Sequence, residues 1–138
     1  MIMKEGNGDG MEMERIPSGI PGLDELIENG FPFPSVILVA GSTGTGKTTF
    51  CLRFLCQGVS RGERGLFFTT LSEPVHWMLR FSSQFNFMKP EYIDKDIVYV
   101  DIGDLIRSGD RDKILEAMDQ KIAEIMPQRI VIDPISVV

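Results

Sequence analysis

The hydrophobic pattern of this chain alternates between short continuous apolar runs and longer segments in which apolar residues recur every three or four positions. A continuous run bounded by turn residues is typical of a strand buried on both faces, whereas the longer spacing is typical of an amphipathic helix. The pattern predicts four strands, at residues 36–40, 66–71, 96–102 and 129–133.

Helical spacing fills the intervals between these strands. We predict helices over residues 47–60, 74–87 and 112–126, and the last of these ends at a proline. Its apolar face consists of Ile114, Leu115, Met118, Ile122, Ile125 and Met126. A shorter helix is predicted within residues 18–30, with Leu23, Leu26 and Ile27 on one face, and residues 31–35 form a proline-broken connector.

This order of elements predicts an α/β fold with a parallel β-sheet flanked by helices, because strands and helices alternate along the chain. The length of 138 residues suits one domain. We expect residues 1–12, which are polar and rich in Gly and Met, to be a flexible tail, and residues 13–138 to form the domain.

A glycine-rich motif lies between the first predicted strand and the first long helix. Residues 41–48, GSTGTGKT, fit the pattern G-x-x-x-x-G-K-[ST]. In that context the glycines let backbone N–H groups converge on phosphate oxygens, and the helix N-terminus adds its positive dipole end. Lys47 would face the outer phosphates and the Thr48 hydroxyl would bind Mg²⁺. The alternative is a glycine-rich turn with an exposed lysine.

Two acids end predicted strands at the edge of the sheet where ligands bind. Asp133 would bind the Mg²⁺ of a phosphate site, although an acid at a strand-to-turn junction can also be held by local backbone N–H groups. Glu73 would accept a proton from the attacking water, or would simply favour the N-terminus of the next helix. Asp101 is interpreted as a turn or cap residue, and no role is assigned to His76.

Composition narrows the classes of function. The net charge is −6, so the chain has no general attraction for nucleic acid or for anionic membranes. Cys51 and Cys56 are the only cysteines and lie in one predicted helix, where reduced thiols are the simplest interpretation. The sequence contains no apolar run of membrane-spanning length and no signal-peptide pattern, so we expect a cytoplasmic protein.

Residues 14–32, 41–50, 62–74 and 129–136 together resemble a KaiC-type ATPase domain of the RecA superfamily. The resemblance implies ATP as nucleotide, Mg²⁺ as metal, and a homo-oligomeric ring or filament. It assigns the metal-binding acid of Walker B to Asp133 and places the catalytic glutamate at the end of the second strand. The Walker A region that it implies comprises Gly41, Ser42, Thr43, Gly44, Thr45, Gly46, Lys47, Thr48 and Thr49.

The chain departs from the family pattern in two places. KaiC-like domains often carry two adjacent glutamates after the second strand, whereas this chain has Ser72 followed by Glu73, which puts hydrolysis in question. The family fold also continues beyond Walker B, and its next strand usually lies between the phosphate-loop strand and the Walker B strand. We therefore expect a RecA-like fold truncated after Walker B, or else direct pairing of residues 129–133 with residues 36–40.

Three functions follow from these observations. The first is an Mg²⁺-dependent ATPase with a regulatory or signalling role, which hydrolyses ATP or phosphorylates itself. The second is a relative of the DNA recombinases, against which stand the acidic balance and the lack of a Lys/Arg stripe with interleaved aromatic residues. The third is a non-catalytic nucleotide-binding assembly module, which Ser72 favours.

Overall fold

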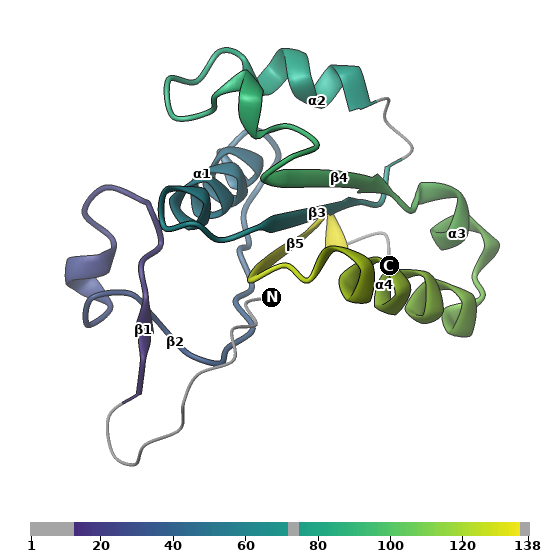
Figure 1. Ribbon diagram of the computed structural model, residues 1–138, viewed down its shortest axis with the longest axis horizontal. Coiled ribbons are helices and arrows are strands. Elements are labelled where there is room, and N and C mark those ends of the chain that lie inside the picture. Colours follow the sequence, from purple (N-terminus) through teal and green to yellow (C-terminus); the bar gives the residue numbers. More distant parts are fainter. Residues whose placement is uncertain (1–12, 72–74, 136–138) are drawn as a thin grey trace.

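The computed structural model describes residues 13–71 and 75–135. Three parallel strands form its central sheet, in the order β4–β3–β5. These strands are β3 (Gly65–Thr69), β4 (Ile97–Asp101) and β5 (Arg129–Asp133). The predicted α/β fold with a parallel sheet flanked by helices is thus confirmed (Figure 1).

The helices lie on both faces of this sheet (Figure 1). Helix α1 (Lys47–Ser60) covers one face, and α3 (Gly103–Ser108) and α4 (Arg111–Ile125) cover the other. A further helix, α2 (Val75–Ser82), follows β3. Two 3₁₀ turns, η1 (Asp24–Leu26) and η2 (Pro90–Tyr92), complete the helical elements of the described residues.

Alternation along the strands builds two separate apolar cores, because successive side chains of a strand point to opposite faces. Phe67, Tyr99 and Val131 point toward α1 and pack with Leu52 and Leu55. The residues between them in the strands point toward α3 and α4, and this second core contains Leu66, Phe68, Ile102, Ile125 and Ile130. Burial on both faces explains why the strands read as continuous apolar runs.

The predicted strand at residues 36–40 is not a strand in the structure. β5 pairs with β3, and within the described residues neither of these strands pairs with residues 36–40. Val36 and Leu38 are 75% and 74% exposed, whereas Ile37 packs against the core on the α1 side. These residues have the β-branched composition of a strand, but a strand also needs a neighbouring strand with which to form hydrogen bonds. None of the described strands lies alongside residues 36–40. The alternative expectation, direct pairing of residues 36–40 with β5, is therefore wrong.

The segment before the phosphate loop differs from the predicted short helix. β1 (Arg15–Ile16) and β2 (Phe31–Pro32) form a two-stranded antiparallel ribbon, in which a proline is tolerated because the ribbon has open edges. Between them only η1 is helical, and Leu26 is 82% exposed instead of facing the core. The Asp24 carboxylate accepts a hydrogen bond from the Ser18 backbone N–H at 3.0 Å, which ties this segment into a loop.

Helix α2 is shorter than the predicted span of residues 74–87. The Ser82 and Ser83 hydroxyls donate to the carbonyls of Leu79 and Arg80, and such side-chain bonds compete with continuation of a helix. The chain then turns back, so that the centroid of the Phe87 ring lies 4.5 Å from the guanidinium carbon of Arg53 on α1.

No helix of the described residues has the length and apolarity needed to cross a membrane.

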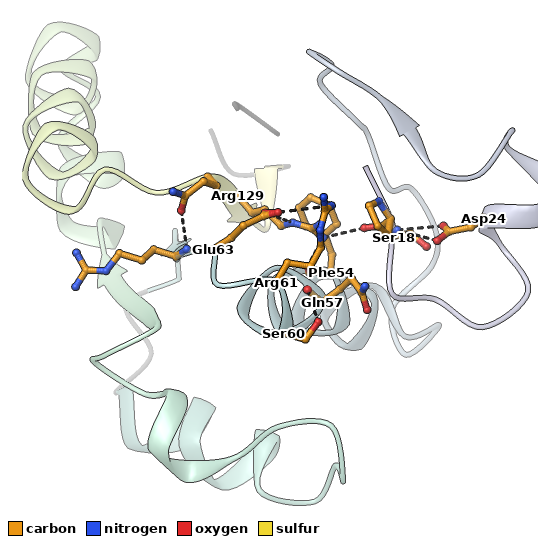
Figure 2. A network of polar contacts seen from close by, with 11 residues as sticks. Ser18, Asp24, Phe54, Gln57, Ser60, Arg61, Glu63 and Arg129 are labelled. Carbon is orange, nitrogen blue, oxygen red and sulfur yellow. Dashed lines mark hydrogen bonds and ion pairs between the residues drawn. The ribbon is translucent and has the colours of Figure 1, made fainter. Parts of the chain in front are cut away.

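A buried arginine joins the ribbon segment, α1 and β5 (Figure 2). Arg129 opens β5, is 1% exposed, and points toward the same face as Val131. Its Nη1 donates to the carbonyls of Pro17 and Phe54 at 2.9 and 2.8 Å, and its Nε donates to Glu63 Oε2 at 3.0 Å. Burial lowers the pKa of Arg129, and Glu63 opposes that shift. This network lies at the amino end of β5, away from the phosphate loop.

Candidate nucleotide site

The glycine-rich loop leads directly into α1, whose first residue is Lys47. Gly44 and Gly46 have φ angles of 81° and 95°, a left-handed conformation that residues with a Cβ rarely adopt. Gly46 is the N-cap of α1, so no side chain caps the first turn, and that turn contains no acidic residue. Free N–H groups and a positive dipole end make such a terminus suited to an anion.

Lys47 lies folded over its own loop. Its Nζ donates to the carbonyl oxygens of Gly41 at 2.7 Å and of Ser42 at 2.8 Å, and the Thr45 hydroxyl also donates to Ser42 O, at 2.7 Å. The ammonium group therefore sits over the turn formed by residues 41–46, and the three hydrogen bonds stabilise the loop's shape. An arriving phosphate would replace carbonyl oxygens as the acceptor of the lysine.

The side chain of Asp133, the last residue of β5, contacts Thr48 in the first turn of α1. Its Oδ2 accepts a hydrogen bond from the Thr48 hydroxyl at 2.8 Å, across 85 positions of sequence. The parallel sheet causes this approach, because β5 ends at the same edge of the sheet at which the chain enters α1. The structure thus brings together two of the residues predicted from the sequence to bind metal, Thr48 and Asp133.

The donor atoms at this point fit Mg²⁺. A hydroxyl and a carboxylate are hard oxygen ligands, and Mg²⁺ in nucleotide sites is held by one or two such groups together with phosphates and water. The described residues contain no group of three or more His, Cys, Asp or Glu side chains able to hold a metal, so they offer no all-protein cage. Mg²⁺ bound there would neutralise charge on the phosphate oxygens.

The remaining predicted residues have different outcomes. Glu73 and the preceding Ser72 lie outside the described residues, so the catalytic assignment of Glu73 stays a prediction. The Asp101 carboxylate accepts from the Gly103 N–H at 2.8 Å, which confirms the interpretation as a turn residue. His76 is exposed in the first turn of α2.

Both cysteines are free thiols, as predicted. Burial raises the pKa of Cys51 to about 11, and the Asp133 carboxylate adds to this shift. Burial also raises the pKa of Cys56 to about 11, and its Sγ lies 3.4 Å from Met88 Sδ. Because the thiolate is the reactive form, these raised pKa values disfavour a nucleophilic role for either thiol, although Cys51 lies in the second turn after the phosphate loop.

Sequence reasoning missed one residue at this edge of the sheet. Thr70 follows β3, is 3% exposed, and donates its hydroxyl hydrogen to the carbonyl oxygen of Pro134 at 2.6 Å. The only available signal was a second threonine at the end of an apolar run, and many strands end that way. Its partner is defined by the pairing register of β3 with β5, which the sequence does not state.

A parallel sheet, a glycine-rich loop that opens a helix, and an acid at the end of a parallel strand define a P-loop NTPase. Comparison with known proteins agrees: the family described as "ATPase: KaiC" matches residues 16–138. The chain belongs to this KaiC ATPase family, as the resemblance of its motifs predicted.

Individual relatives show how much of a whole protein this chain represents. It is 29% identical to the circadian clock oscillator protein KaiC of Prochlorococcus marinus (strain MIT 9313), over 96% of this chain and 28% of that protein. It is 30% identical to a UPF0273 protein of Pyrococcus horikoshii, over 88% of this chain and 55% of that protein. The crystal structure of a KaiC-like protein from P. horikoshii superimposes with a TM-score of 0.74 and 38% identity, covering 88% of this chain and 54% of that chain. The chain therefore spans from about a quarter to about half the length of these relatives.

Proposed function

We propose that this chain forms the nucleotide-binding part of an Mg²⁺-dependent ATPase that binds ATP on residues 41–49. The observation that carries the proposal is the hydrogen bond between the Thr48 hydroxyl and Asp133, beside a helix N-terminus that no side chain caps. Membership of the KaiC ATPase family supports ATP as the nucleotide. In this proposal Lys47 and the backbone N–H groups bind the phosphates, while Thr48 and Asp133 hold Mg²⁺.

Hydrolysis needs a group that accepts a proton from water, and Glu73 takes that role in the proposal. The chain leaves β3 at Thr69, at the same edge of the sheet as Asp133, and Glu73 follows four residues later. A regulatory role, a cytoplasmic location and assembly into a homo-oligomeric ring or filament belong to the same proposal. The names of the circadian clock relatives support the regulatory role.

A non-catalytic nucleotide-binding module is the second candidate, favoured by Ser72 in the position before Glu73. Both candidates bind ATP, but only the first releases phosphate. Action on DNA is less well supported, because the net charge of −6 opposes general binding to phosphate backbones.

Incubation of the chain with ATP labelled on its γ-phosphate separates these functions in one experiment. Bound ATP, released phosphate and label attached to the protein are measured with Mg²⁺ and again with excess EDTA. Release of phosphate only with Mg²⁺ is the expected result. Binding without release would favour the non-catalytic module, label on the protein would indicate self-phosphorylation, and absence of ATP binding would overturn the proposal.

Glu73→Gln is expected to slow phosphate release by about 10²-fold or more, since loss of a general base typically costs that much. The affinity for ATP should stay within twofold, because glutamine has the same shape and the phosphate ligands are unchanged. Single-turnover rates and nucleotide titrations measure the two effects separately. Equal rates for the variant and the original protein would remove Glu73 from the mechanism, and Glu91→Gln, at an exposed residue of η2, is the matched control.

A further inference from the structure

The end of β3 is tied to the turn that follows Asp133. Thr69 and Asp133 are partners in the parallel ladder and are the last residues of their strands. One residue later, the Thr70 N–H donates to the Asp133 carbonyl oxygen at 3.3 Å, and the Thr70 hydroxyl donates to the Pro134 carbonyl oxygen at 2.6 Å. One nearly buried side chain and its own amide thus hold two consecutive carbonyl groups.

The sequence explains why a side chain is used at this point. Pro134 has no N–H group, so its carbonyl oxygen is its only backbone hydrogen-bonding group and needs a donor from another residue. The Thr70 hydroxyl is that donor, and it bonds to the proline's carbonyl oxygen.

In the proposed site, the carboxylate of Asp133 binds Mg²⁺ together with Thr48. Its Oδ2 lies 2.8 Å from the hydroxyl oxygen of Thr48, a residue of helix α1. A metal-binding group must be held to within about 0.5 Å by its supporting contacts. The Asp133 side chain is half-buried, and the backbone that carries it is held from the end of β3 by the two hydrogen bonds of Thr70.

We infer that Thr70 is a positioning residue for the metal-binding carboxylate: by holding the carbonyl groups of Asp133 and Pro134, it sets where that carboxylate lies relative to Thr48. The inference rests on the proposed function, since it takes Asp133 to bind Mg²⁺.

The test compares Thr70→Val, which keeps the shape and removes the hydroxyl, with Thr70→Ser, which keeps the hydroxyl. Thr69→Val is the matched control on the preceding residue, which is also buried, at 8% exposed. Mn²⁺ serves as the metal probe and is titrated by electron paramagnetic resonance in the presence of ATP. ATP affinity is measured separately in EDTA, and amide hydrogen exchange at Thr70 reports whether the turn loosens without any ligand.

Thr70→Val is expected to weaken Mn²⁺ binding roughly 10- to 100-fold, as loss of a partner that orients a metal ligand typically does. ATP affinity in EDTA should be unchanged, exchange at the Thr70 amide should accelerate, and the Ser and Thr69 variants should match the original protein. Unchanged Mn²⁺ affinity in Thr70→Val would overturn the inference, as would a similar loss in Thr70→Ser, a result available even if the valine variant does not fold. Absence of Mn²⁺ and ATP binding by the original protein would instead overturn the proposed function, and the metal-positioning role with it.

Discussion

Replacement of Lys47 by alanine is expected to remove most of the affinity for ATP while leaving the fold intact. The lysine is the cation of the phosphate loop, and its Nζ already lies over the turn of residues 41–46. Loss of one member of a desolvated, hydrogen-bonded charge pair costs about 2–5 kcal/mol in binding. That range corresponds to a roughly 30- to 4,000-fold increase in Kd.

Stability should change little in the same variant. The two carbonyl groups that Lys47 holds belong to Gly41 and Ser42, which are exposed, so water can replace the ammonium group as their partner. The free energy of unfolding should therefore stay within about 0.5 kcal/mol of the original value, as for other exposed positions. Coupled loss of binding and stability would indicate damage to the loop and not the loss of a phosphate contact.

Isothermal titration with ATP, with and without Mg²⁺, measures the effect. Lys121→Ala is the matched control, because Lys121 lies on α4 and pairs with the exposed Glu124 at 3.4 Å. Lys47→Arg adds a second comparison: it keeps the charge but replaces a compact ammonium group by a planar fork. If Lys47→Ala bound ATP as tightly as Lys121→Ala, the phosphate assignment of the loop would be wrong.

The sequence predicted those parts of the fold whose signals are local. Helix α1 was predicted at residues 47–60 and β5 at residues 129–133, with the bounds that the structure has. In both cases neighbouring residues carry the signal: apolar residues at helical spacing after the glycine-rich motif, and a continuous apolar run before Asp133. The juxtaposition of Thr48 with Asp133 followed from a rule of topology, that ligands bind at the carboxyl edge of a parallel sheet.

The errors concern features that depend on distant partners. Residues 36–40 have the composition of a buried strand, but pairing is decided by which other strand lies alongside, and Val36 and Leu38 remain exposed in the described structure. The hydroxyl contact of Thr70 depends on the register between β3 and β5. Helix α3 was not predicted, because its six residues carry no strong helical periodicity. Glu73 remains a prediction from the sequence, since it lies outside the described residues.

Arg129 is a further residue whose environment depends on distant partners, and this environment bears on the stability of the fold. An arginine at the first position of an apolar strand would ordinarily be taken as an exposed start, yet this one is among the least exposed residues of the described chain. Its position is possible because Gly58 of α1 leaves room: a Cβ at that residue would lie 2.8 Å from Arg129 Cδ. The guanidinium carbon lies 4.6 Å from the centroid of the Phe54 ring, which adds a cation–π contact.

Arg129→Met is therefore expected to destabilise the protein by about 3–5 kcal/mol, the usual cost of removing one partner from a buried ion pair. Glu63, which is 9% exposed, would lose its nearest cation among the described residues and keep the more distant Arg61, at 3.6 Å. The carbonyl groups of Pro17 and Phe54 would lose their donor as well. Against a total stability of about 5–15 kcal/mol for a typical domain, this loss is large enough to shift the unfolding midpoint clearly.

Urea unfolding followed by circular dichroism measures the loss, and a double-mutant cycle with Glu63→Met identifies its origin. The double variant should be more stable than Arg129→Met alone, because the uncompensated buried carboxylate is gone. Arg107→Met is the matched control, since Arg107 pairs with Asp104 on the exposed side of α3 and should cost less than about 1 kcal/mol. Equal losses in the two arginine variants would mean that the buried pair contributes no more than a surface pair. The Arg129 network contacts α1 at Phe54 and Gly58, on the C-terminal side of the helix, whereas Lys47 is its first residue. Any Arg129 variant that folds should therefore bind ATP normally. That result would show that Arg129 stabilises the fold and takes no part in nucleotide binding.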